Sequence, residues 1–375
     1  MELKTIVFLM TVGLMLFRTE STLAQHSPIK SDEQVTFFPT LGWQETGSPG
    51  DWVLQIHGWI YEPEEDSIRR RLLLSSLCSS LSLLNESCDS EIFKTRARLF
   101  IVDNERGKSI PIAVGGQSTI STASGSEGHF RAEQRFSAAQ LLPLRAKSGP
   151  WIPFQAITKA ADARVFAGQV FALEQSGISI ISDIDDTIKV SAVRDHNELL
   201  KNTFIRPFKA VPGMAELYRS WATSGASFHY LTASPWQLYL PLAEFFAQEH
   251  FPAGTFQMKE FRWKDSRFFD LFMSPEKFKT PLIVSLIERF PKRKFVLVGD
   301  SGEKDPEIYG SIAARFPDQD IRIVIREVEG APMDLTRQAT AFKSVTTGRW
   351  QIVDDETIQS ETGRQGIGEF VLGPD

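Results

Sequence analysis

Short apolar runs alternate with amphipathic segments over residues 178–328, and this alternation constrains the fold more than any other feature of the chain. Apolar runs that predict strands begin at Ile178, Ser227, Lys294 and Ile321. Between them lie segments whose apolar positions recur with helical periodicity. Strands alternating with helices predict a parallel sheet that helices cover on both faces. Residues 178–328 are therefore predicted to form an α/β domain.

The first predicted strand ends in an acidic cluster, Asp183-Ile-Asp185-Asp186-Thr187, which has the pattern D-x-D-x-T. Ligands of open α/β sheets bind outside the carboxyl ends of the strands. There Asp183 could attack phosphorus, while Asp185 could protonate the leaving oxygen and later activate water. Thr187 is expected to cap the turn, and Asp186 to be a turn or surface residue. An acidic turn without catalytic function would give the same pattern, so this motif alone leaves the function open.

Two further polar clusters are expected at the same edge of the sheet. Thr232 follows the predicted strand SFHYLTAS, where its hydroxyl could donate to a phosphoryl oxygen; capping the next helix is the alternative for Thr232 or Ser234. Lys279 begins a predicted helix, where its ammonium could neutralise a nucleophile and a phosphoryl group. Lys277 is a rival for this function, and either lysine could simply be solvated.

The stretch KFVLVGDSGEKD supplies the fourth cluster, with Asp300 at the end of a predicted strand and Asp305 five residues later. Oxygen-rich acidic ligands suit Mg²⁺, which takes one or two carboxylates and keeps several waters. Asp300 is expected to bind the ion together with Asp183, and Asp305 to hold its waters. Because Pro306 follows, Asp305 could also cap the next helix.

In this order, the four clusters resemble the motifs of the haloacid dehalogenase superfamily of phosphotransferases. The stretches DIDDTIKVS, LTASPWQL and FPKRKFVLVGDSGEKDPEIYG resemble the catalytic domain of Mg²⁺-dependent phosphatidate phosphatases of the actin-patch-associated type. The resemblance implies a Rossmann-like fold and hydrolysis of phosphatidate to diacylglycerol. Asp183 would be the nucleophile and Asp185 the acid/base. Mg²⁺ would be held by Asp183, Asp300 and the backbone carbonyl of Asp185.

Residues 35–172 have a different pattern, of short alternating or apolar runs separated by turn residues, which predicts an all-β, sandwich-like domain. Cys78 and Cys88 are expected to form a local disulfide rather than a metal or catalytic site. Residues 329–375 read as a polar and loosely ordered tail.

The first 24 residues resemble a secretory signal, with a charged start, an apolar run over residues 5–17 and small residues before a cleavage site after Ala24. An uncleaved anchor is the alternative, and both place the chain outside the cytosol, periplasmic or secreted. The formal net charge of −6 provides no basic footprint for nucleic acid.

The spacing of the four clusters leaves room for a minimal cap only, so the expected site is open. An open site suits a lipid phosphate at a membrane surface, and phosphatidate is the expected substrate. The segment KEFRWKDSRFF, which mixes basic and aromatic residues, is a candidate membrane contact, although an ordinary surface element is an equal alternative. Soluble or protein-bound phosphomonoesters, or a non-catalytic binding function, remain the other possibilities. The partner of the β-rich domain is not predicted.

Overall fold

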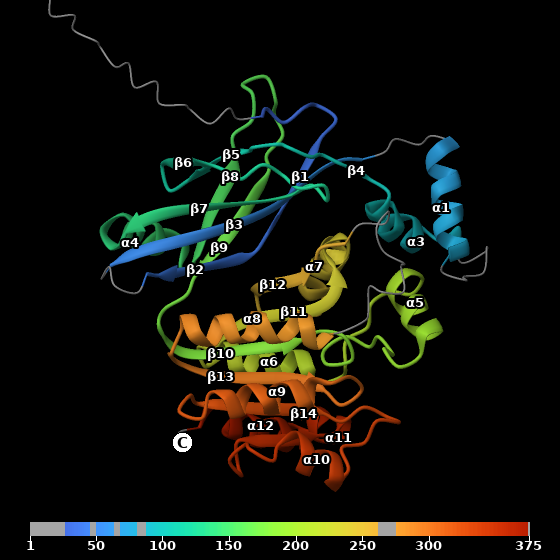
Figure 1. The fold of residues 1–375 in the computed structure, drawn as a ribbon, viewed down its shortest axis with the longest axis vertical. Helices are drawn as coiled ribbons and strands as arrows, with labels where there is room; N and C mark the ends of the chain where they lie inside the picture. Colours follow the sequence, from blue (N-terminus) through green and yellow to red (C-terminus); the bar gives the residue numbers. More distant parts are fainter. Residues whose placement is uncertain (1–26, 46–49, 64–67, 81–87, 262–274, 374–375) are drawn as a thin grey trace, which may run out of the picture.

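The structure is a computed structural model that describes residues 27–45, 50–63, 68–80, 88–261 and 275–373. Two sheets dominate it, one of mixed strands in the N-terminal part and one of parallel strands in the C-terminal part (Figure 1). Residues 1–24, on which the signal prediction falls, lie outside the described ranges. No helix within those ranges is long and apolar enough to cross a membrane.

The C-terminal sheet confirms the predicted α/β class. Its six strands are all parallel, in the order β12-β11-β10-β13-β14-β15. The chain therefore runs from β10 outward through β11 and β12, and then returns to the other side of β10 with β13. Their bounds are β10 Ser176–Asp183, β11 Ser227–Pro235, β12 Gly254–Lys259, β13 Lys292–Asp300, β14 Ile321–Arg326 and β15 Trp350–Val353. The topological switch point, where such sheets bind ligands, lies between β10 and β13.

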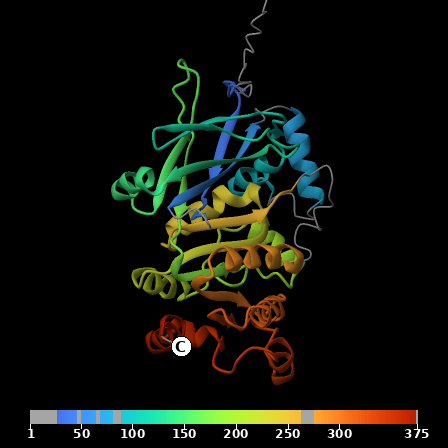
Figure 2. The same ribbon diagram turned by 60° about the vertical axis from the view of Figure 1, so that its left-hand side comes forward.

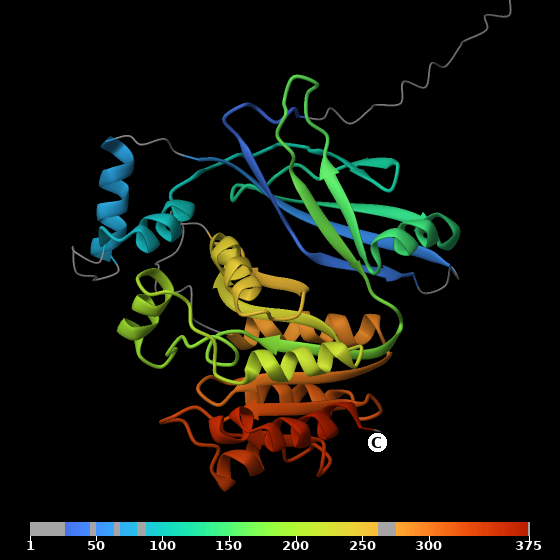
Figure 3. The ribbon, with the colours of Figure 1, turned by 180° about the vertical axis from the view of Figure 1, so that it is seen from behind.

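Helices cover both faces of this sheet because successive residues of its strands point to opposite faces. Ile180 packs with residues of α6 and α12, whereas Ile181 packs with residues of α8 and α9. The helices α8 and α9 lie in front of the sheet in Figure 1, and α6 and α12 in Figure 3. The helices are α5 His196–Phe204, α6 Met214–Thr223, α7 Tyr239–Gln248, α8 Pro275–Arg289, α9 Asp305–Arg315, α10 Leu335–Ala341, α11 Asp355–Gln359 and α12 Glu361–Leu372.

The prediction of a loosely ordered polar tail after residue 328 is wrong. Strand β15 pairs with β14 and extends the sheet, and α10, α11 and α12 follow the same α/β arrangement. Ile367 and Val371 of α12 are fully buried. The polar composition hid this helix because only a narrow stripe of its residues is apolar.

The N-terminal part forms one curled sheet of nine strands within the described ranges. Strands β6 and β7 lie at opposite edges of this sheet. They approach each other just beyond the end of β6, where Thr122 N donates to Arg131 O at 2.7 Å. The strands therefore form one hydrogen-bonded sheet, and the predicted sandwich of two packed sheets is not confirmed. The strands are β1 Gln34–Phe38, β2 Thr40–Gln44, β3 Asp51–Glu62, β4 Asp103–Asn104, β5 Pro111–Val114, β6 Gln117–Ile120, β7 His129–Ser137, β8 Trp151–Ala156 and β9 Ala167–Ala172.

This part is not all-β, contrary to the prediction, because it also contains helices α1 (Ile68–Ser80), α3 (Glu91–Ala97) and α4 (Ala138–Ser148). Local capping explains α4: the Ser137 hydroxyl accepts from Gln140 N, and the Gln140 side chain accepts from Ser137 N. Cys78 and Cys88 form the predicted disulfide, which ties α1 to the turn before α3.

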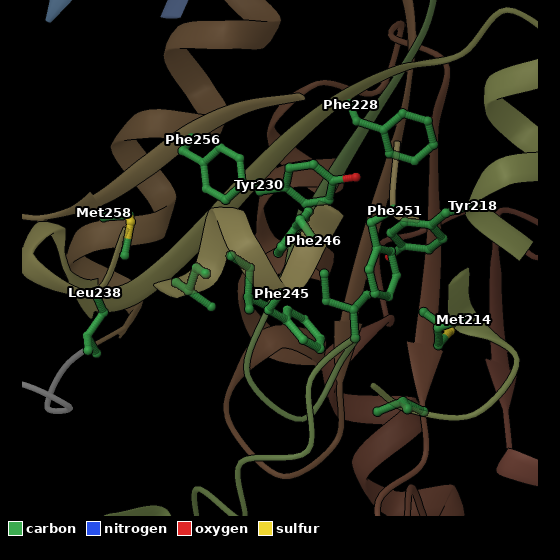
Figure 4. Close-up of a cluster of buried hydrophobic side chains, with 14 of the residues drawn as sticks. Met214, Tyr218, Phe228, Tyr230, Leu238, Phe245, Phe246, Phe251, Phe256 and Met258 are labelled. Atoms are coloured by element: carbon green, nitrogen blue, oxygen red, sulfur yellow. The ribbon is translucent and has the colours of Figure 1, made fainter. Parts of the chain in front are cut away.

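The two sheets lie one above the other (Figure 2) and share a hydrophobic core. Phe256 N of edge strand β12 donates to Pro39 O at 3.2 Å, so the N-terminal sheet covers that edge. An aromatic cluster around Tyr230, Phe246 and Phe256 fills the adjoining space (Figure 4). The N-terminal domain is thus packed directly on the α/β domain.

Candidate active site

The predicted residues converge at the switch point of the parallel sheet. Asp183 ends β10 and Asp300 ends the neighbouring strand β13, while Asp305 begins α9. Lys279 reaches them from α8 and is fully buried. These four side chains come from four different elements, so only the fold brings them together.

Lys279 is the cation at the centre of this group. Its Nζ lies 2.8 Å from Asp183 Oδ1, 2.5 Å from Asp305 Oδ1 and 3.6 Å from Glu303 Oε2. Burial disfavours a charged ammonium, but the carboxylates outweigh this effect and raise the pKa of Lys279 above its usual range. Lys279 is therefore protonated at neutral pH. Its rival Lys277 is exposed and is not part of this group.

The carboxylates exceed the positive charge of Lys279. One carboxylate oxygen from each of Asp183, Asp300 and Asp305 lies within 4.8 Å of the others. Burial and the neighbouring carboxylates raise the pKa of Asp183 and Asp300 well above the usual range, despite the opposing charge of Lys279. A further cation beside Asp183 and Asp300 would therefore favour their ionised forms.

Two atoms indicate where such a cation fits. Asp300 Oδ2 and Asp305 Oδ2 are buried and have no hydrogen-bond partner in the described part of the chain. Unpartnered buried carboxylate oxygens are costly unless a cation binds them. An all-oxygen donor set of this kind fits Mg²⁺. Asp305 does not cap α9 with its side chain, so the alternative that it serves as a helix cap is wrong.

Backbone geometry fixes the Asp300 turn. Gly302 N and Glu303 N donate to Asp300 Oδ1 at 2.6 and 3.2 Å, which leaves Oδ2 free to bind a cation. Gly299 allows the close approach of Asp305, because a Cβ at position 299 would lie 2.3 Å from Asp305 Oδ2.

The turn after Asp183 is held by two other residues of the motif. Thr187 Oγ1 donates to Asp183 Oδ2 at 3.0 Å and so orients the carboxylate. Asp186 adopts a positive φ of 56° and accepts from the backbone N–H groups of Ser191, Ala192 and Val193 at 2.7–2.8 Å. Asp186 is therefore a buried turn residue that organises the following loop, which confirms the turn alternative and excludes the surface alternative.

Asp185 lies apart from the three clustered carboxylates. Its Oδ2 accepts from Thr232 Oγ1 at 2.6 Å and from Ser234 Oγ at 3.2 Å. Its Oδ1 accepts from Ser191 Oγ at 2.7 Å and lies 2.8 Å from Lys189 Nζ. Burial would raise the pKa of Asp185, but Lys189 and the hydroxyls outweigh it and lower the pKa to about 2. Asp185 is thus an ionised hydrogen-bond acceptor, and Thr232 donates to it in this structure.

Sequence reasoning missed three residues around the site. Glu303 contacts Lys279, and burial raises its pKa to about 7. Lys189 is buried against Asp185. Arg326, which ends β14, donates to Asp186 O at 2.6 Å and pairs with Asp355. The signal available for Arg326 was its position as a charged residue at the end of a predicted strand. Lys189 lies in a turn, where no such positional signal exists.

A pocket of about 410 Å³ adjoins the Asp300 turn. Its lining combines this turn with the loop held by Asp186 and the start of α8, namely Val193, Arg194, Glu276, Lys277, Gly302, Glu303 and Lys304. Three basic side chains, Arg194, Lys277 and Lys304, thus line this pocket together with two acidic ones, Glu276 and Glu303. The lining is therefore mixed in charge, with one basic side chain in excess.

The fold and the site together define a class: a doubly wound α/β protein with a cluster of buried carboxylates and a buried lysine at its switch point. Comparison with known proteins narrows the class. Residues 178–327 match the family model described as "Phosphatidate phosphatase APP1, catalytic domain". This segment is therefore similar to the catalytic domain of that family.

Two curated fungal proteins are similar to this chain. Phosphatidate phosphatase APP1 of Saccharomyces cerevisiae is 36% identical over 155 residues, which cover 40% of this chain and 26% of the yeast protein. An uncharacterized protein of Schizosaccharomyces pombe is 30% identical over 169 residues, covering 44% of this chain and 27% of that protein. The matched region thus spans about a quarter of the length of either relative.

Proposed function

We propose that the chain is a Mg²⁺-dependent phosphomonoester hydrolase of the haloacid dehalogenase type, acting through an aspartyl-phosphate. The observation that carries this proposal is the convergence of Asp183, Lys279, Asp300 and Asp305, with two unpartnered carboxylate oxygens among them. Asp183, Asp300 and Asp305 would hold Mg²⁺, either directly or through its waters. When bound, the ion would neutralise the carboxylates and the incoming phosphoryl group.

The residues of this chain divide the reaction between them. Asp183, oriented by Thr187, attacks phosphorus with one carboxylate oxygen, and the bond to the leaving oxygen breaks. Lys279 stabilises the negative charge on the nucleophile and the transferred group. Water then attacks the aspartyl-phosphate and releases inorganic phosphate.

Asp185 is the proposed acid/base. It is an ionised acceptor, but a pKa of about 2 makes it a weak base for the proton of the attacking water, so this step needs a weaker contact with Lys189. To protonate a leaving oxygen it must first gain a proton, which requires a weaker contact with Lys189 and the Thr232 hydroxyl. We therefore propose that Asp185 changes partners during the reaction.

Phosphatidate or a related lipid phosphate is the proposed substrate, with diacylglycerol and phosphate as products. The match of residues 178–327 to the phosphatidate phosphatase family model supports this proposal. The minimal cap and the membrane contact through KEFRWKDSRFF also stay proposals, because residues 262–274 lie outside the described ranges.

Phosphate release from phosphatidate-containing vesicles and from a soluble phosphomonoester, each with Mg²⁺ or EDTA, tests the proposed function. We expect Mg²⁺-dependent release that is faster from vesicles. Release from the soluble ester alone would overturn the lipid assignment and favour a soluble or protein-bound phosphoester. Undiminished release in EDTA would overturn the metal dependence, and no release from either substrate would favour a non-catalytic binding function.

We also propose that the protein is exported, with residues 1–24 as its signal. The disulfide between Cys78 and Cys88 supports this proposal, since disulfides persist mainly in oxidising compartments. Mass spectrometry of the mature protein should find Gln25 at its N-terminus. A mature chain that begins at Met1 and is found in the cytosol would contradict export.

A further inference from the structure

A second group of metal-ligating side chains lies where the N-terminal sheet packs on the α/β domain. His57 belongs to β3 and His129 to the neighbouring strand β7, while Glu260 directly follows β12. Both histidine rings lie against Phe38 and Trp236, so they face the α/β domain. Figure 1 shows β12 beneath the N-terminal sheet. The group therefore bridges two parts of the chain that are far apart in sequence.

The distances suit a small metal ion. His57 Nε2 and His129 Nδ1 lie 3.1 Å apart, and one ligand atom from each of the three residues lies within 4.8 Å of the others. Two nitrogens bound to a tetrahedral Zn²⁺ at about 2.05 Å are separated by about 3.3 Å. The two imidazoles are thus placed almost as a bound ion would require.

A hydrogen bond between the two rings does not satisfy all of their polar atoms. His129 is buried, and its Nε2, the ring nitrogen that does not approach His57, has no hydrogen-bond partner in the described part of the chain. Either ring nitrogen of a histidine can bind a metal ion. By contrast, both ring nitrogens of the buried His229 have partners, in Ser179 and Thr255.

Glu260 supplies an anionic ligand whose orientation is already set. Its Oε1 accepts from Arg131 Nη2 at 2.8 Å. Both side chains are substantially exposed, so this ion pair contributes little stability by itself. A hydrogen bond of this kind commonly orients a metal-binding carboxylate.

We propose that His57, His129 and Glu260 form a binding site for a transition-metal ion of the zinc class. Imidazole nitrogens and one carboxylate favour such an ion over Mg²⁺, which prefers oxygen ligands. The ion would link β3 and β7 to the segment after β12. It would also lie beside Trp236, which follows Thr232 and Ser234 at the candidate active site. The site is distinct from the carboxylate cluster in place and in ligand chemistry.

Titration of the full chain with Zn²⁺ and with Co²⁺, in excess Mg²⁺, tests this proposal. Wild-type protein should bind one equivalent of Zn²⁺ that Glu260→Gln and His129→Asn weaken at least tenfold. Bound Co²⁺ should give the strong visible absorption of a four- or five-coordinate site, which six-coordinate oxygen sites lack. Zn²⁺ should also raise the melting temperature of the wild type and not that of the two variants.

Three controls keep the test specific. Asp300→Asn should retain the Zn²⁺ site, because it alters only the carboxylate cluster. His250→Asn changes an exposed histidine with a positive φ that asparagine tolerates, and it should bind like the wild type. Arg131→Gln removes the ion-pair partner of Glu260 but none of the three ligands, so it should still bind Zn²⁺. Glu260 is partly exposed, so Glu260→Gln should fold even if His129→Asn does not. Equal Zn²⁺ affinity in the wild type and Glu260→Gln, or loss of binding in Asp300→Asn, would overturn the proposal.

Discussion

At the scale of single residues, Asp300 combines two properties that seldom occur together. Its Oδ1 is held by two backbone N–H groups, while its buried Oδ2 has no hydrogen-bond partner among the described residues. Ionisation of such a group without a bound cation destabilises the folded protein.

The isosteric variant Asp300→Asn separates these two effects. A raised carboxyl pKa means that the folded state holds the proton more tightly than the unfolded state. In EDTA, the stability of the wild type should therefore fall as the pH rises above about 4, the unfolded value. The variant should show less of this fall, and at pH 7 it should melt at a higher temperature than the wild type.

Mg²⁺ should reverse the order, because it stabilises the wild type and has little effect on Asp300→Asn. Thermal melts in EDTA and in Mg²⁺ measure both effects, and Asp318→Asn, an exposed carboxylate, is the matched control. Equal Mg²⁺-induced shifts in wild type and Asp300→Asn would argue against Asp300 as a ligand.

Gly299→Ala tests the close packing beneath the site. The new Cβ would lie 2.3 Å from Asp305 Oδ2 and 2.7 Å from Tyr309 Cε2, so Asp305 must shift away from Lys279. We expect phosphate release to fall by about 10²-fold, since small displacements of positioning groups are costly. Gly366→Ala, where nothing lies within 4 Å, should keep full activity. Wild-type activity in Gly299→Ala would show that the position of Asp305 is unimportant.

Sequence reasoning found Asp183, Lys279, Asp300 and Asp305 because each lies at the end of a strand or the start of a helix. It did not find the surroundings of Asp185, because Lys189 and Ser191 reach that carboxylate through a tight turn with no periodic pattern. The contact of Asp305 with Lys279, in place of a cap on α9, was equally impossible to predict from the sequence. Such contacts depend on side-chain directions that local sequence does not specify.

At the scale of elements, α12 shows how a narrow apolar stripe can anchor a mostly polar helix. Ile367 is fully buried in the core cluster that also contains Trp221 of α6. Ile367→Ala should therefore lower the free energy of unfolding by about 2–4 kcal/mol. Gln365→Ala, on the exposed side of the same helix, should change it by less than about 0.5 kcal/mol. Urea titration measures both, and similar values for the two variants would mean that α12 is not docked.

The disulfide joins Cys78 of α1 to Cys88 before α3, with a sequence separation of 10 residues. Loop-closure entropy predicts that Cys78→Ser with Cys88→Ser costs about 3 kcal/mol of unfolding free energy. The reduced wild type should behave like the double variant, and Ser79→Ala is a control that keeps the bridge. Urea titrations with and without reductant measure the effect. Identical curves under both conditions would show that the bridge does not stabilise the fold.

The parallel strands β10, β11, β13 and β14 were predicted because their apolar runs are long and separated by amphipathic segments, whereas the edge strand β12 was not among the predicted strands. The helices α1, α3 and α4 were not predicted, because they are short and interrupt a pattern of alternating strands. The same limitation hid β15, a strand of four residues that is only partly buried and gains its place by pairing with β14.

At the scale of the whole molecule, the N-terminal sheet covers the edge of the parallel sheet and contacts the segment that carries Thr232 and Ser234. Phe38 and His57 both pack on Trp236, only two residues beyond Ser234. The relative position of the two domains could not be predicted, because the residues in contact are far apart in sequence. This contact is the physical route by which the N-terminal domain can influence the site.

The central claim is that Asp183 carries the phosphoryl group during turnover. The most direct measurement is rapid acid quenching with a phosphate-labelled substrate and Mg²⁺, followed by mass spectrometry of the peptide that contains residue 183. The account predicts a hydroxylamine-sensitive phosphoryl label on Asp183 in the wild type. It also predicts no label and at least about 10³-fold slower phosphate release in Asp183→Asn. Phosphate release by Asp183→Asn at the wild-type rate, or a label on another residue, would contradict the account.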